Sequence, residues 1–214
     1  MNFIDVHTHS IKNDTHITSI RNTYPSDPEP TTFFSTGIHP WYIEKQNIEN
    51  EFHQLSQKLL SKNCLAIGEC GLDKLTSTEY TLQIAVFKRH IELSETHKKP
   101  LIIHCVKAYN DLISLKKELV PKQPWIVHGF NKNIQVAKDL LKNNITLSIG
   151  ASLLTNKKLQ IISKEIPVEN ILLETDNSKE SIINIYNTFA TVKNESTESI
   201  KKQINKNFNR IFTL

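Results

Sequence analysis

The sequence FIDVHTH, residues 3–9, is the stretch that decides the fold. Its apolar and β-branched residues predict a short strand. Because side chains alternate along a strand, Asp5, His7 and His9 lie on one face. Imidazole pairs are common metal ligands, so this face predicts the floor of a metal site. The alternative is a strand end that carries two exposed histidines.

Apolar strands and amphipathic helices alternate through the rest of the chain. Strands are predicted at residues 3–9, 16–22, 32–37, 64–69, 101–104, 125–128, 145–148 and 171–176. Helices are predicted at residues 50–60, 79–97, 109–119, 134–141, 153–164, 181–193 and 196–212. Several strands are continuous apolar runs, which is typical of a parallel sheet covered on both faces. No linker or repeat interrupts the pattern, so we expect one α/β domain over residues 1–214.

The connection between the first two strands is unusually short. The residues between His9 and His16 are too few to hold a helix. A parallel crossover usually takes about a dozen residues or more. We therefore expect the second strand to be antiparallel to the first, or not to be its neighbour in the sheet.

Composition and charge exclude several classes of protein. The chain has 214 residues and a formal net charge of +4, which is compatible with an anionic substrate. No apolar run reaches the roughly 18 residues that a membrane span needs, and no signal-peptide pattern opens the chain, so we expect a soluble, cytoplasmic protein. Its cysteines, Cys64, Cys70 and Cys105, form no C-x-x-C pair. They predict buried free thiols and not a disulfide framework.

Metal-competent side chains stand at the carboxyl ends of most predicted strands. These residues are His7, His9, His39, Glu69, His104, His128 and Asp176. In a closed parallel barrel all such ends form one rim, which is where barrel enzymes keep their active sites. In an open doubly wound sheet, ligands gather only near the switch point. The spread of these residues over the strands therefore favours a (β/α)8 TIM barrel, trimmed by the helix missing after the first strand.

The number of candidate ligands predicts more than one ion. Four imidazoles and two carboxylates are too many for one tetrahedral zinc site. They suit two divalent ions that share a carboxylate, with Glu69 as the bridge. Imidazoles favour zinc or another transition metal, whereas carboxylates with phosphate substrates permit magnesium, so Zn²⁺, Mg²⁺ and Mn²⁺ stay open.

Six short motifs occur in order along the chain. They are D-x-H-x-H (5–9), G-I-H-P (37–40), G-E-x-G-L-D (68–73), I-H-C (103–105), H-G-F (128–130) and E-T-D (174–176). On these motifs the chain, from about Phe3 to Phe212, resembles the TatD family of metal-dependent hydrolases. The resemblance implies an amidohydrolase-type TIM barrel, a one- or two-metal centre and DNase activity that is often exonucleolytic. Carried over by motif, the metal ligands are His7, His9, Glu69, His104, His128 and Asp176. Asp176 would also orient or deprotonate the attacking water, which makes Asp176 and Glu69 the expected catalytic residues.

The chain departs from the family pattern where substrate would be held. Val106 stands where a basic residue is common, and Lys107 follows it. The residues after G-L-D, here Lys74 and Leu75, lack the expected aromatics and arginine. Asp176 is followed by Asn-Ser-Lys and not by a small residue and proline. The metal centre is complete in sequence, while the substrate contacts are altered.

Several further residues have supporting roles. We expect Asp5 to orient a metal ligand and His39 to contact a ligand or the substrate phosphate in preference to binding metal itself. Asp73 holds the turn after Glu69 or touches substrate, and Lys107 is a candidate phosphate contact. Trp41 and Tyr42 could stack on a base, but packing is the favoured interpretation. The helical histidines His53, His90 and His97 are expected at the surface.

These observations predict metal-assisted hydrolysis of a phosphodiester, with DNA as the expected substrate. Fold does not determine substrate, so hydrolysis of an ester, lactone or amide on the same centre is a second reading. A metal-binding scaffold without turnover is a third. We expect a monomer with no protein partner and no membrane contact.

Overall fold

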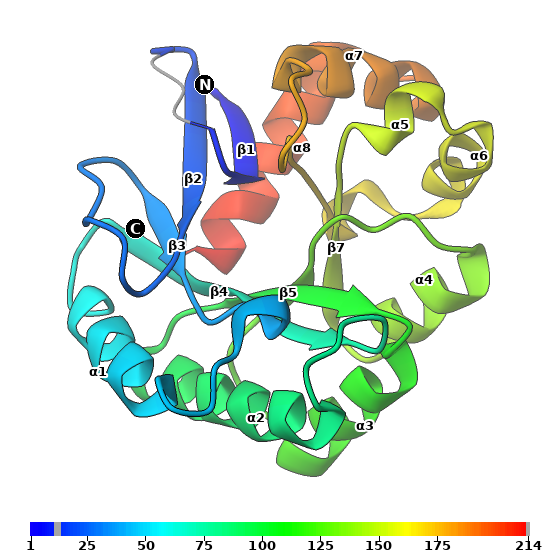
Figure 1. Ribbon diagram of the computed structural model, residues 1–214. Coiled ribbons are helices and arrows are strands. Elements are labelled where there is room, and N and C mark those ends of the chain that lie inside the picture. The colour runs from blue at the N-terminus through cyan, green and yellow to red at the C-terminus, as the bar shows by residue number, and fades with distance from the viewer. Residues whose placement is uncertain (11–13, 213–214) are drawn as a thin grey trace. The chain divides into compact units, whose positions relative to one another are not determined.

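The computed structural model describes residues 1–10 and 14–212 (Figure 1). These residues form two compact units. The first unit joins Met1–Arg21 to His128–Leu214, and the second is Asn22–Val127. The expectation of a single domain over the whole chain stays a prediction.

In the described residues, a strand or helix occurs at each position where the sequence predicts one. The strands are β1 (Phe3–Thr8), β2 (Ile17–Thr23), β3 (Phe34–Thr36), β4 (Cys64–Asp73), β5 (Leu101–Val106), β6 (Trp125–Val127), β7 (Ile145–Ile149) and β8 (Ile171–Leu173). The α-helices are α1 (Ile48–Lys58), α2 (Tyr80–His97), α3 (Tyr109–Leu119), α4 (Ile134–Lys142), α5 (Ser152–Thr155), α6 (Lys157–Glu165), α7 (Ile182–Lys193) and α8 (Thr197–Ile211). Two short 3-10 helices are η1 (Pro40–Tyr42) and η2 (Val168–Asn170). The strands follow one another in sequence order, from β1 to β8.

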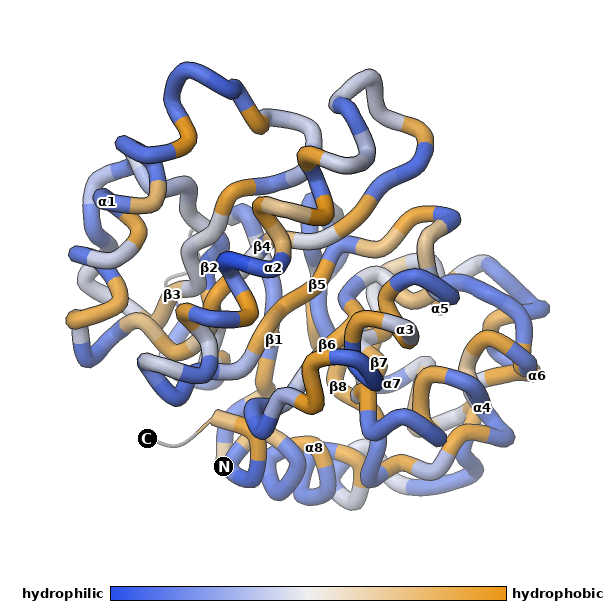
Figure 2. The backbone as a smooth tube through the Cα atoms, turned by 90° about the horizontal axis from the view of Figure 1, so that it is seen from below, coloured by the Kyte–Doolittle hydropathy of each residue, from blue (hydrophilic) through white to orange (hydrophobic). Residues whose placement is uncertain are grey.

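The second unit is built on parallel pairing of β3, β4, β5 and β6. All ten residues of β4 are buried, as expected for a strand covered on both faces. Helix α2 packs along β4, and the tube view shows the hydrophobic run of β5 in orange (Figure 2). Since residues 69, 71 and 73 of β4 share one face, the carboxylates of Glu69 and Asp73 lie on the same face of the strand.

Gly71 allows β4 and β5 to approach closely. It pairs with His104 and has a φ of +143°, which L side chains rarely adopt. A Cβ at this position would stand only 2.1 Å from the His104 carbonyl oxygen. The glycine therefore lets the imidazole of β5 reach the carboxylates of β4.

The first unit is built on β1 and β8, which are held together at their carboxyl ends by a parallel bridge between Thr8 and Asp176. Strand β8 also pairs in parallel with β7. Helices α7 and α8 pack beside β1 (Figure 1). The Tyr186 hydroxyl of α7 accepts from the Ile4 amide at 3.0 Å and lies 3.1 Å from the Ile4 carbonyl oxygen. These contacts anchor the strand that carries His7.

The expected arrangement of the second strand is wrong. Strand β2 pairs with β1 in parallel, with Phe3 opposite Ile17. Extended chain covers about 3.3 Å per residue, so the connection between Thr8 and Ile17 is long enough to return along β1 without a helix. No helix occurs among its described residues, which lie on either side of 11–13.

The expected helix at 153–164 is two helices, α5 and α6. Asn156 has an extended backbone, and its side chain accepts a hydrogen bond from the Leu159 amide. This is an N-cap, which begins a new helix and ends the old one.

The cysteines are buried free thiols, as predicted. Burial raises the pKa of the Cys64 thiol to about 12, so it is inert at neutral pH. Across residues 1–10 and 14–212, we find no helix with the length and apolar character needed to cross a membrane.

Candidate metal centre

The first unit gathers three of the predicted ligands at the ends of its strands. One ligand atom each from His7, His128 and Asp176 lies within 4.8 Å of the others. The Asp176 carboxylate lies 3.6 Å from His7 Nε2 and 3.4 Å from His9 Nε2. His7 is fully buried, whereas the Asp176 side chain is 38% exposed. The cluster therefore has a buried floor and a carboxylate that faces solvent.

Asp5 fixes the segment that carries Asp176. Its buried carboxylate accepts from the Thr175 amide at 2.9 Å and from the Thr175 hydroxyl at 2.7 Å. Asp176 itself has a φ of +52°, and its amide donates to the His7 carbonyl oxygen at 2.9 Å. A left-handed backbone at a non-glycine residue persists only where the surroundings hold it. Asp5 acts on Asp176 through Thr175.

Glu174 is a buried carboxylate that the sequence analysis did not single out as a site residue. Its Oε1 accepts from the Gly129 amide at 2.6 Å and lies 3.5 Å from His128 Nδ1. Burial alone would raise its pKa, but the contacts with His128 and the charge of His7 keep the pKa below its usual value. Glu174 orients the His128 ring. A carboxylate that contacts the second ring nitrogen of a metal-binding histidine usually has this role. The position of Glu174 in the E-T-D motif could have identified it from the sequence.

The second unit gathers His39, Glu69 and His104. One ligand atom from each lies within 4.8 Å of the others. Glu69 Oε1 lies 3.0 Å from His39 Nε2 and 2.9 Å from His104 Nδ1. The Glu69 amide donates to Asn22 Oδ1 at 2.7 Å, which fixes the backbone of this carboxylate. The sequence predicted that His39 contacts a metal ligand or the substrate phosphate. In the structure His39 contacts Glu69 directly.

Asp73 contacts His104 through its carboxylate. Its Oδ2 is 3.1 Å from His104 Nε2 and accepts from the Trp41 indole at 2.6 Å, while Oδ1 accepts from the Leu75 amide at 2.8 Å. Burial alone would raise its pKa, but these hydrogen bonds hold the pKa below the usual range. Asp73 therefore contacts both the backbone after β4 and His104, while a contact with substrate stays a prediction.

His90 holds the backbone of Ile38, the residue before His39, and is not at the surface, where the sequence had predicted it. It is fully buried, with Nδ1 2.8 Å from the Val86 carbonyl oxygen and Nε2 accepting from the Ile38 amide at 3.0 Å. Burial lowers its pKa to about 4, so the imidazole is neutral near pH 7. Sequence reasoning missed this role because His90 and Ile38 are far apart in the chain. Of the other helical histidines, His53 is exposed and His97 half-buried.

The altered substrate positions offer little free positive charge. Lys107 is exposed just beyond β5, where it could meet a phosphate. Lys74 is held by Asp111, with 2.6 Å between Nζ and Oδ2. Its availability as a phosphate contact is therefore reduced.

The donor sets of the two clusters fit divalent metal ions. Each offers imidazole nitrogens with a carboxylate oxygen, which are the ligands that zinc and related ions take. Donor atoms bound to one ion at about 2.0–2.2 Å lie within about 4.4 Å of one another, close to the separations found here. His7, His128 and Asp176 would hold an ion in the first unit. In the second unit Glu69 and His104 would hold an ion, and His39 would support Glu69, whose Oε1 lies 3.0 Å from His39 Nε2.

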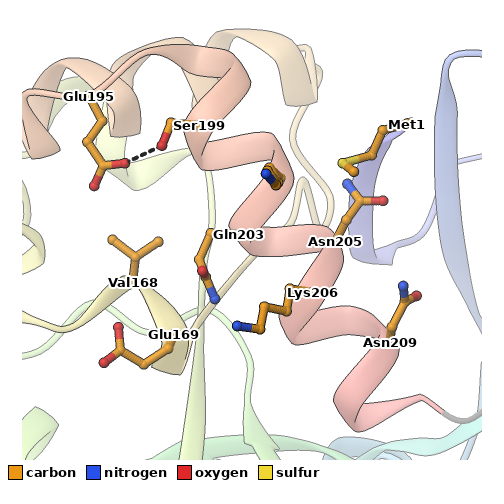
Figure 3. A pocket seen from close by; sticks show the side chains of 10 residues that line it. Met1, Val168, Glu169, Glu195, Ser199, Gln203, Asn205, Lys206 and Asn209 are labelled. Atoms are coloured by element: carbon orange, nitrogen blue, oxygen red, sulfur yellow. Dashed lines mark hydrogen bonds between the residues drawn. The ribbon is translucent and has the colours of Figure 1, made fainter.

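A separate cavity of about 660 Å³ opens along α8, and Figure 3 shows it from close by. No predicted site residue lines it. Its charged residues are mixed in sign, and Glu195 accepts a hydrogen bond from Ser199 at 2.7 Å. The lining residues are Met1, Val168, Glu169, Glu195, Ser199, Lys202, Gln203, Asn205, Lys206 and Asn209.

A family model described as TatD related DNase matches residues 3–213. The chain belongs to the TatD family. An uncharacterized metal-dependent hydrolase of Buchnera aphidicola subsp. Baizongia pistaciae is 34% identical over 198 residues, which cover 84% of this chain and 74% of that relative. The human 3'-5' RNA nuclease TATDN2 is 35% identical over 148 residues, 65% of this chain and 19% of the human protein.

The fold is shared with solved TatD structures. The crystal structure of the TatD homologue YjjV from Escherichia coli matches with a TM-score of 0.85 at 18% identity, covering 99% of this chain and 98% of that one. The predicted TIM-barrel class is therefore confirmed, and so is the predicted family. At the level of this TatD family, the expectation of a metal-dependent hydrolase is also confirmed.

Proposed function

We propose that this TatD-family chain hydrolyses phosphodiester bonds in nucleic acid, with DNA as its substrate and attack from a strand end. The observation that supports this most is the pair of imidazole–carboxylate clusters, one in each unit, at or near the carboxyl ends of strands. Such groups are the ligands of two-metal phosphoesterases. The family description as TatD related DNase supports the choice of DNA.

The proposed ligands are His7, His9, Glu69, His104, His128 and Asp176, which bind two divalent ions drawn from Zn²⁺, Mg²⁺ and Mn²⁺. Bound divalent ions would supply Lewis acidity and lower the pKa of water toward neutrality. That Glu69 is shared by both ions stays a prediction from the sequence.

The protein's own groups divide the remaining work. Asp176 is the exposed carboxylate of the first cluster, and two imidazoles lie within 3.6 Å of it. In this proposal it steers the attacking water and accepts its proton, as a general base must. His7 and His128 form the buried floor beneath it. Asp5 and Glu174 keep these groups in position through Thr175 and His128.

RNA is a second candidate substrate. The human relative is named a 3'-5' RNA nuclease, and it is 35% identical over the matched residues. DNA and RNA offer the same phosphodiester bond to these clusters and differ in the sugar. The 2'-hydroxyl is the group that would decide between them.

A substrate panel tests the proposal. Metal-saturated protein is incubated with end-labelled single-stranded DNA, the matching RNA, bis-p-nitrophenyl phosphate and a set of lactones, each with Mg²⁺, Mn²⁺ and Zn²⁺. We expect DNA shortened stepwise from one end and no lactone hydrolysis. Lactone hydrolysis without any phosphodiester cleavage would move the assignment to carbonyl chemistry. Bound metal without turnover on any substrate would identify a scaffold.

A further inference from the structure

We propose that Trp41 and Tyr42 form a stacking platform for a nucleobase of the substrate strand. This inference rests on the proposed function and names the part of the substrate that the second unit grips. The two residues belong to η1, which packs against β4. The sequence favoured packing of these rings inside the fold, but both rings are exposed in the structure.

Both rings face solvent. Trp41 is 53% exposed and Tyr42 is 52% exposed. Among residues 1–10 and 14–212, they are the only aromatic side chains among the large exposed hydrophobic ones. Two adjacent exposed aromatic rings form a contiguous apolar surface, which is a feature of ligand-binding sites.

The rings are also held in fixed positions. The Trp41 indole donates to Asp73, and the Trp41 amide donates to His39 Nδ1 at 3.1 Å. The Tyr42 ring meets the Tyr24 ring edge-on, with 5.5 Å between centroids. A base that stacks on such rings would cost little side-chain entropy, because the rings are already ordered.

The platform adjoins the metal-competent cluster of the same unit. The Trp41 ring centroid lies 4.8 Å from that of His39 and 5.5 Å from that of His104, both at steep angles. Trp41 and His104 also share the Asp73 carboxylate. A phosphate bound at this cluster would therefore bring a neighbouring base within reach of the rings.

Stacking would compensate for the altered basic residues that could contact phosphate in this chain. Val106 replaces a basic residue, and Lys74 is paired with Asp111. Aromatic rings hold bases of any sequence, because every base has a π-face. The platform accordingly predicts binding of single strands with little sequence preference.

Binding to a strand that resists cleavage tests the platform directly. Fluorescein-labelled phosphorothioate decathymidine is titrated with metal-saturated protein, and anisotropy gives the Kd. We expect Trp41→Leu to weaken binding about 5- to 100-fold, because stacking on one aromatic contributes about that much. Trp41→Phe keeps a ring and should retain most of the affinity. Leu60→Ala, which changes an exposed apolar residue after α1, is the matched control and should bind like the parent chain.

Two further measurements keep the platform testable if Trp41→Leu fails to fold. Tyr42→Leu leaves the Trp41–Asp73 hydrogen bond untouched and should also weaken binding. In the parent chain, the exposed Trp41 should be quenched by the oligonucleotide, while the other tryptophan, Trp125, is fully buried and should not respond. Unchanged affinity in both leucine variants, or absence of quenching, would overturn the platform.

A backbone without bases separates this inference from the proposed function. An abasic decamer of the same length should bind the parent chain as weakly as decathymidine binds Trp41→Leu. Cleavage is measured on the unmodified phosphodiester forms of both strands. Equal binding and equal cleavage of the two strands would refute the platform and leave the phosphodiesterase standing. Trp41-dependent binding of decathymidine without any cleavage would support the platform and refute the phosphodiesterase.

Discussion

Asp176 carries its carboxylate on a left-handed backbone, at the solvent-facing edge of the cluster in the first unit. Asp176→Asn keeps the shape of this side chain and removes its basicity. Cleavage of DNA should fall by about 10²–10⁴ if the carboxylate is the general base. Turnover under metal saturation measures this. Glu165→Gln, an exposed change on α6, should cleave normally. Near-normal turnover of Asp176→Asn would remove the residue from this role.

Thr175→Val tests how Asp176 is held. The substitution keeps the shape of the side chain but deletes the hydroxyl that donates to Asp5 at 2.7 Å. Removing a hydrogen-bond donor from a buried carboxylate costs about 1–3 kcal/mol. The free energy of unfolding should therefore fall by that amount. Urea denaturation gives the value. Thr191→Val on the exposed face of α7 should change stability by less than about 0.5 kcal/mol. Equal losses in both variants would contradict the positioning role.

The sequence could identify the candidate ligands because the chemistry of each residue type is local. It could not reveal which atoms they meet. His39 and Glu69 touch because β3 and β4 are neighbours in the sheet. The exposure of Trp41 and the burial of His90 also depend on packing between distant segments. Motif and spacing carry no direct information on such contacts.

Gly71 decides how closely β4 and β5 can pack. Gly71→Ala puts a methyl group 2.1 Å from the His104 carbonyl oxygen, at a φ of +143°. We expect a loss of more than about 3 kcal/mol in unfolding free energy, because backbone must move to relieve the clash. Thermal or urea unfolding measures it. The matched change is Gly150→Ala, whose added carbon would have ordinary 3.5 Å contacts, and it should cost far less. Similar stability of the two variants would refute the close-approach argument.

His90 makes the contact between α2 and the segment before η1 sensitive to acid. Its pKa is lowered to about 4 in the folded chain, from about 6.5 when unfolded. The unfolded chain therefore takes up this proton first, so the stability from neutral His90 is present above about pH 6.5 and is lost as pH falls toward 4. The loss is at most about 3 kcal/mol.

Urea denaturation at several pH values tests the role of His90. His90→Gln can still accept from the Ile38 amide but does not titrate. The variant should lose less stability than the parent chain between pH 6.5 and pH 4. His53→Gln, which changes an exposed histidine on α1, should follow the parent curve. Parallel curves for His90→Gln and the parent would contradict the burial argument.

At the level of elements, periodicity predicted the strands and most of the helices. It could not show that Asn156 would cap a new helix, because Asn is also common inside loops. Nor could it give the direction of β2. Typical crossover lengths argued for an antiparallel strand, but the actual chain needs only enough extended residues to return along β1.

Within each unit, the described residues present a set of metal donors, and two ions are expected per chain. Elemental analysis of the metal-saturated protein measures this number. His128→Ala and His104→Ala should each lower it, whereas His53→Ala should not. Saturation should also raise the free energy of unfolding, by about 2.7 kcal/mol at a hundred times Kd. A chain that binds no metal, or keeps two ions in both cluster variants, would contradict the assigned ligands.

The fold of the whole molecule was predictable because strand–helix alternation and polar strand ends point to the same architecture. The TM-score of 0.85 to the Escherichia coli homologue confirms this class. The substrate was less predictable. The metal ligands are common to hydrolases that cleave different bonds, and the positions that would hold substrate are altered in this chain.

Metal-restored cleavage tests the central claim most directly. The 214-residue chain is stripped with EDTA, dialysed, and assayed on end-labelled single-stranded DNA before and after Mn²⁺, Mg²⁺ or Zn²⁺ is returned. We predict that stripping abolishes cleavage and that at least one ion restores it in the parent chain, with Asp176→Asn at least about 100-fold slower. Cleavage that survives stripping, or no cleavage of DNA or RNA by protein that holds its full complement of metal, would contradict the account.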